Sequence, residues 1–116
     1  MADAARVALA ADRAETAARL AALEREFAAI VDSVAAGQAG GDDEHDPEGS
    51  TIAFERQHVA ALIDQAREHL GAIEAARARL ADGSYGRCGR CGQPIGAERL
   101  AARPTATQCV RCAARR

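Results

Sequence analysis

The sequence contains no lysine and no tryptophan, and only three phenylalanine or tyrosine side chains among its 116 residues. So few large side chains cannot fill a broad hydrophobic core, and much of the 48% hydrophobic content is alanine, which buries little area per residue. A chain of this kind needs tight helix packing, a metal ion or disulfide bonds to stay folded. Cysteine is also absent from residues 1–87, so all four cysteines lie near the C-terminus.

Long uncharged runs are missing as well. Residues 1–36 are rich in apolar side chains, but charged residues interrupt them repeatedly, and no run approaches the roughly 18 residues of a membrane helix. The N-terminus shows no secretory signal, so we expect a cytoplasmic protein without membrane association. In a reducing compartment, paired cysteines favour metal binding over structural disulfide bonds.

The charges are divided unevenly along the chain. Residues 1–86 carry 16 acidic side chains and 8 arginines, whereas residues 87–116 carry 7 arginines and one acid, Glu98. The acidic and basic parts predict two different contact surfaces.

Two segments show the heptad pattern of a coiled coil, with apolar residues at alternating steps of four and three. The first runs through Leu9, Arg13, Thr16, Leu20, Leu23, Phe27, Ile30 and Val34. The second runs through Ile52, Arg56, Val59, Ile63, Ala66, Leu70, Ile73, Arg77 and Leu80. The two patterns predict a pair of long helices that pack through these positions.

The ends of these helices have local signals. Gly37 stops the first helix, and Gly40–Gly41 prevent its continuation. The second helix starts either at Asp46–Pro47 or after Ser50, and Gly83 ends it.

These signals predict a mainly α fold, an antiparallel two-helix coiled-coil hairpin followed by a small C-terminal four-cysteine zinc-finger lobe. The hairpin takes residues 1–83, with helices at about 4–36 and 47–82 and an acidic tip at 37–49, and the lobe takes 84–116. The alternative is a bundle formed by dimerisation. The short linker and the similar lengths of the two heptad segments favour a hairpin within one chain, hence a monomer.

The cysteines form two Cys-x-x-Cys pairs, Cys88 with Cys91 and Cys109 with Cys112, which are separated by 17 residues. This spacing is typical of a zinc ribbon or a related finger, and an iron–sulfur cluster or a redox dithiol is the alternative. Four sulfur ligands close the coordination sphere, so we expect one structural Zn²⁺ and no catalytic site. No other constellation in the sequence suggests an enzyme.

The segments "DPEGSTIAFERQ", "YGRCGRCG" and "RLAARPTATQC" together resemble the DksA/TraR family of bacterial transcription regulators. The resemblance covers residues 46–112. It implies that the coiled coil enters the secondary channel of RNA polymerase and that its acidic tip approaches the catalytic centre. Transcription initiation would be modulated without sequence-specific DNA contact, and the alarmone ppGpp becomes a candidate second ligand.

The acidic tip lies in "DDEHDPE" at 42–48, where the candidate polymerase-facing residues are Asp42, Asp43, Asp46 and Glu48. Asp46 matches the first acidic residue of the family's tip pattern, whereas Gly49 and Thr51 occupy its other two positions. These acids either act on the polymerase or solvate a turn while Asp46 caps a helix.

Two other functions compete with this one. The arginine-rich C-terminal segment is also consistent with a zinc module that binds nucleic-acid phosphates. The segment offers no aromatic platform for stacking bases, which argues against that function. The third hypothesis is a coiled-coil adaptor with an unrelated partner.

Overall fold

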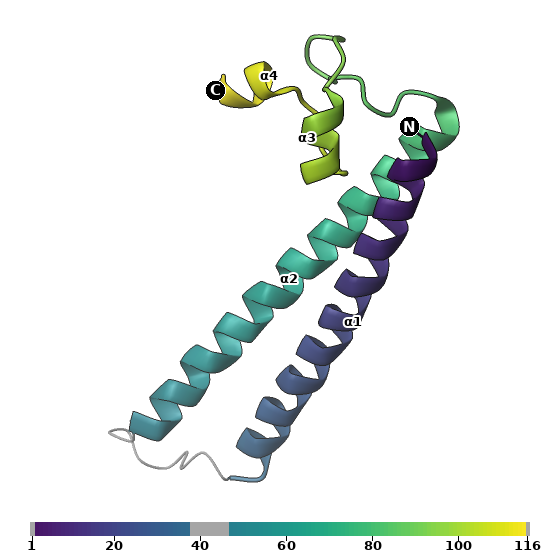
Figure 1. Ribbon diagram of the computed structural model, residues 1–116. Coiled ribbons are helices and arrows are strands. Elements are labelled where there is room, and N and C mark those ends of the chain that lie inside the picture. Colours follow the sequence, from purple (N-terminus) through teal and green to yellow (C-terminus); the bar gives the residue numbers. More distant parts are fainter. Residues whose placement is uncertain (1, 38–46, 116) are drawn as a thin grey trace. The chain divides into compact units, whose positions relative to one another are not determined.

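The computed structural model describes residues 2–37 and 47–115, leaving aside the side chains of residues 47–50. It contains four helices, which are α1 (Ala2–Ala35), α2 (Pro47–Asp82), α3 (Ala97–Ala102) and α4 (Val110–Ala114) (Figure 1). Among these described residues there is no strand, and the one β-bridge joins Arg87 to Pro94. The mainly α fold predicted from the sequence is therefore confirmed. No helix in the described ranges has both the length and the apolarity to cross a membrane.

Glycines mark the ends of both long helices. The backbone N–H of Gly37 donates to the carbonyl of Val34 at 3.0 Å, and Gly37 itself has a φ of 74°, which a side chain would disfavour. At the end of α2, Gly83 has a φ of 85°. Helix α2 begins at Pro47, the earlier of its two candidate starts, where the missing N–H of proline costs no helical hydrogen bond.

The chain divides into two compact units, one formed by Met1–Glu15 with His69–Arg116 and the other by Thr16–Glu68. In the first unit the beginning of α1 lies beside the end of α2. Leu9 meets Ile73 and Ala76 in a buried cluster, and all three are 0% exposed. Leu9 and Ile73 both occupy heptad positions, so the heptad pattern in the sequence correctly identifies the buried faces of α1 and α2 in this unit.

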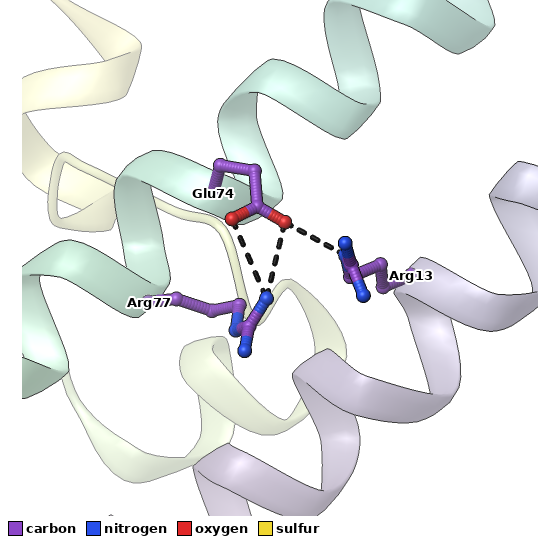
Figure 2. A network of polar contacts seen from close by, with 3 residues as sticks. All are labelled: Arg13, Glu74 and Arg77. Atoms are coloured by element: carbon purple, nitrogen blue, oxygen red, sulfur yellow. Dashed lines mark hydrogen bonds and ion pairs between the residues drawn. The ribbon is translucent and has the colours of Figure 1, made fainter.

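Two charged residues at heptad positions of this unit form a network across the two helices. Arg13 Nε donates to Glu74 Oε1 at 2.8 Å, and Arg77 Nη1 donates to the same oxygen at 3.2 Å (Figure 2). About half of each of the three side chains is exposed to solvent. The aliphatic parts of arginines can lie on the seam while the guanidinium groups reach the surface, so charge at these positions does not interrupt the pairing.

In the second unit, α2 buries Val59, Ile63 and Ala66, which are three successive heptad positions. The matching residues of α1 are half-buried, namely Leu20, Leu23, Phe27 and Ile30. Arg67 and Glu24 form an ion pair of 3.0 Å between the helices. In both units α1 and α2 therefore pair in antiparallel order, as the hairpin prediction requires.

The lobe has a small core of its own in which Cys88 and Cys112 pack with Ile95 and Leu100. Tyr85 contacts this cluster and also the cluster around Leu9 and Ile73. Its hydroxyl donates to the carbonyl of Pro104 at 2.7 Å, and burial raises the pKa of its phenol. Tyr85 therefore joins the helix pair of the first unit to the cysteine lobe.

We expect Tyr85→Phe to lower the free energy of unfolding by about 1 kcal/mol, because the partly buried Pro104 carbonyl loses its donor. Tyr85→Ala should cost about 3 kcal/mol, because it also removes the ring from both clusters. Denaturant unfolding of the metal-loaded protein measures both values. Equal losses for the two variants would mean that the ring contributes nothing beyond its hydroxyl.

Candidate metal centre

The first cysteine pair lies on a tight turn. The backbone N–H of Cys88 donates to the carbonyl of Gln93 at 2.8 Å, and the N–H of Gly92 donates back to the carbonyl of Cys88 at 2.9 Å. Gly92 has a φ of 77°, so the turn needs a residue without a side chain there. A further bond of 2.7 Å, from Ile95 N–H to the Gly86 carbonyl, closes the base of the turn. The backbone of this turn thus directs the side chains of Cys88 and Cys91 to the same side of the turn.

The second pair lies at the start of α4. Cys109 is the N-cap residue of this helix, and its sulfur accepts the backbone N–H of Cys112 at 3.4 Å. This hydrogen bond holds the sulfur of Cys109 close to Cys112, the second cysteine of the pair. The N–H of Gly89 donates to the carbonyl of Thr107 at 2.9 Å, which brings the second pair against the first.

The four cysteines meet at a single point. Their sulfur atoms all lie within 4.8 Å of one another, and Cys91 Sγ is 3.9 Å from Cys109 Sγ. In a tetrahedral zinc site with Zn–S bonds of about 2.3 Å, sulfurs are about 3.8 Å apart. None of the four cysteines is in a disulfide bond. The cluster therefore fits one tetrahedral metal ion, as the spacing predicted.

The protein environment already favours thiolates at part of this cluster. Backbone hydrogen bonds, first from Cys109 and then from Cys91, lower the pKa of the Cys88 thiol to about 6. The pKa of Cys109 is also lowered, chiefly by the backbone N–H of Cys112. Burial raises the pKa of the Cys112 thiol to about 12. A divalent ion would displace the remaining protons, because thiolates are the form of cysteine that binds metal.

Three arginines of the lobe donate to backbone carbonyls around this cluster. Arg87 binds the carbonyl of Gly92 at 3.1 Å, and Arg99 binds that of Gln108 at 2.8 Å. Arg90 Nη1 reaches the carbonyls of Cys112 and Arg115, at 3.4 and 3.1 Å. The sequence predicted that these arginines form a basic surface. It gave no signal of their hydrogen bonds to backbone carbonyls, because only the fold brings those carbonyls within reach.

The cluster and the fold define a mainly helical protein with a four-cysteine zinc finger. Residues 83–116 match the family described as the prokaryotic dksA/traR C4-type zinc finger. The structure of transcription factor DksA2 from Pseudomonas aeruginosa is similar to this chain with a TM-score of 0.79 and 30% identity, covering 98% of this chain and 81% of that one. The chain belongs to the DksA/TraR family, and the resemblance seen in its motifs is confirmed.

Curated relatives match over shorter segments. The RNA polymerase-binding transcription factor DksA of Caulobacter vibrioides is 51% identical over 47 residues, which are 40% of this chain and 33% of that protein. The uncharacterized protein YteA of Bacillus subtilis is 39% identical over 71 residues, or 61% of this chain and 30% of that protein. The matched segments thus span about a third of these relatives.

The structure does not place the predicted tip residues. Asp42, Asp43 and Asp46 lie outside the described residues, and Glu48 falls in α2 without a described side chain. Their assignment to a polymerase-facing tip therefore stays a prediction.

Proposed function

We propose that this protein binds RNA polymerase and regulates transcription initiation, with the turn between α1 and α2 inserted into the secondary channel. The observation that carries the proposal is the similarity to transcription factor DksA2, which extends over 98% of the chain at 30% identity and therefore includes the helix pair as well as the finger. The name of the Caulobacter relative, an RNA polymerase-binding transcription factor, points to the same partner.

Within this proposal, residues 1–83 form the hairpin and residues 84–116 form the lobe that holds one structural Zn²⁺. Its ligands are Cys88, Cys91, Cys109 and Cys112, whose mutual distances support a four-sulfur site. When bound, the ion crosslinks the two cysteine pairs. With four protein ligands it has no open position for water, so the proposed role is regulatory binding and not catalysis.

The remaining parts of the proposal follow from the same role. A protein that works on RNA polymerase acts in the cytoplasm, and we propose that it does so as a monomer. The alarmone ppGpp is the proposed second ligand. No sequence-specific contact with DNA is needed.

The basic lobe could instead bind nucleic acid through its phosphates. However, Arg87, Arg90 and Arg99 donate to carbonyls of the lobe, so fewer donors are directed outward than the sequence suggests. This bonding favours a protein partner over a nucleic-acid partner.

A pull-down with core RNA polymerase tests the proposal. We expect the zinc-loaded protein to be retained and then displaced by another factor that occupies the secondary channel. A parallel gel shift with random DNA over a range of salt concentrations measures non-specific binding. Retention that such a competitor cannot reduce would place the contact elsewhere on the polymerase. Strong, salt-sensitive DNA binding without polymerase retention would favour the nucleic-acid module.

At the tip, we expect Asp46→Asn to abolish the effect on transcription while leaving polymerase affinity within about twofold, because the helix pair and the lobe supply most of the contact area. Asparagine caps a helix about as well as aspartate, so this substitution tests the negative charge separately from any capping role. In vitro transcription at matched occupancy measures the effect.

The comparison variant neutralises Asp42, Asp43 and Glu44 together. If that variant loses activity and Asp46→Asn does not, the acting acids are among Asp42, Asp43 and Glu44, and the assignment of Asp46 is wrong.

A further inference from the structure

Both cysteine pairs have the same sequence pattern, Cys-x-Arg-Cys, in "CGRC" and "CVRC". Arg90 and Arg111 therefore occupy equivalent positions, each directly before the second cysteine of its pair. The structure distinguishes them. Arg111 is exposed and, within the part of the chain that the structure describes, has no side-chain hydrogen bond, whereas Arg90 bonds to the opposite cysteine pair.

The bonds of Arg90 connect the two halves of the metal centre. Arg90 lies in the first turn, and its Nη1 donates to the carbonyls of Cys112 and Arg115 in the last turn of α4 and at its C-cap. The Cys112 carbonyl also accepts the backbone N–H of Arg115 at 3.2 Å, and the second lone pair of this oxygen is available to the guanidinium of Arg90. The bonds therefore hold α4, with its ligand Cys112, against the first cysteine pair.

Among the described residues, only one hydrogen bond between backbone N–H and backbone carbonyl joins the same two halves, from Gly89 to Thr107, and the backbone N–H of Cys109 also bonds to the sulfur of Cys88. Both of these bonds act at or before Cys109, whereas the bonds of Arg90 reach the end of α4. Since 17 residues separate the two cysteine pairs, bringing the pairs together without metal costs conformational entropy. The hydrogen bonds of Arg90 offset part of this cost.

We propose that Arg90 is a positioning residue for the metal, which keeps the two cysteine pairs together and so slows the release of zinc. This inference rests on the proposed zinc ligands but not on polymerase binding. It concerns the outer contacts of the site, where loss of a partner commonly weakens metal binding by about 10- to 100-fold.

The test measures the rate at which the zinc-loaded, full-length protein transfers its metal to an excess of a chromogenic chelator. We expect Arg90→Gln to speed the transfer at least about tenfold and Arg90→Lys to lie between this variant and the wild type. Arg111→Gln is the matched control, because it removes the same charge at the equivalent position of the other pair. It should stay within about twofold of the wild type.

Two further measurements separate positioning from general destabilisation. Amide exchange should quicken in Arg90→Gln at Ala113 and Arg115, whose N–H groups donate to the carbonyls of Cys109 and Cys112, while exchange in α1 and α2 is unchanged. The cobalt-substituted variant should keep the absorption of a tetrahedral four-thiolate site.

Equal transfer rates for Arg90→Gln and Arg111→Gln would overturn the proposal, as would unchanged exchange in α4. If Arg90→Gln does not load with zinc while Arg111→Gln does, the proposal holds in its strongest form. A wild type that contains no zinc would instead overturn the ligand assignment on which the inference rests.

Discussion

Removal of zinc is expected to unfold the cysteine lobe and to leave most of the helical signal in place. Structural zinc contributes on the order of 10–16 kcal/mol in isolated finger peptides, more than this small lobe can supply from its own packing. Its core consists of Ile95 and Leu100 around two of the cysteines, Cys88 and Cys112. Without the ion, nothing of comparable strength holds the two cysteine pairs together.

The helix pair should survive because its buried residues lie outside the lobe. Helices α1 and α2 contain 34 and 36 residues, against 6 and 5 in α3 and α4, so circular dichroism should fall only slightly on chelation. Amide exchange resolved along the chain should show lost protection in residues 84–115 and retained protection around Leu9 and Ile73. A lobe that stays protected after complete loss of zinc would contradict the prediction.

Zinc binding should also weaken as the pH falls, because protons compete for the thiolates. The direction follows from Cys112, whose thiol has a pKa raised to about 12 by burial and must release its proton to the solvent when metal binds. Competition with a chelator of known affinity at pH 8 and pH 6 measures the change. Substituting Cys91 by serine should remove zinc binding at both values.

Ile73→Ala is expected to lower the free energy of unfolding of the helix pair by about 2–5 kcal/mol. Ile73 is 0% exposed and packs in α2 against Leu9 of α1, so the truncation leaves a cavity between two helices that few large side chains could fill. Native proteins have a free energy of unfolding of about 5–15 kcal/mol, so the midpoint of denaturant unfolding should shift clearly.

The matched control is Val7→Ala, in the same compact unit. Val7 is 71% exposed, so its truncation should change the free energy of unfolding by no more than about 0.5 kcal/mol. If the two variants have the same stability, the buried contact between Leu9 and Ile73 is not what holds this end of the helix pair together.

The sequence alone determined the type of fold and the metal chemistry, because both depend on short-range spacing. A repeat of three and four residues places side chains on one face of any helix, and this repeat identified Leu9, Val59, Ile63 and Ile73, all of which are buried. Likewise, a Cys-x-x-Cys segment can place two sulfurs on one ion whatever surrounds it, and the four sulfurs do meet. The family resemblance rested on the same local motifs.

The tertiary structure alone decided which partners the charged side chains take. His69 illustrates this, since the sequence gave no reason to expect it 2.8 Å from Asp12, a residue 57 positions away in the other helix. The pairing of Arg13 and Arg77 with Glu74 is of the same kind.

The clearest case is Arg90, which the sequence cannot tell from Arg111 because both stand in a Cys-x-Arg-Cys segment. Only the approach of the α4 carbonyls separates them, and that approach depends on how the 17 residues between the cysteine pairs fold back. Long polar side chains have many rotamers and bind whatever acceptor the fold brings within reach, so their partners cannot be derived from local spacing.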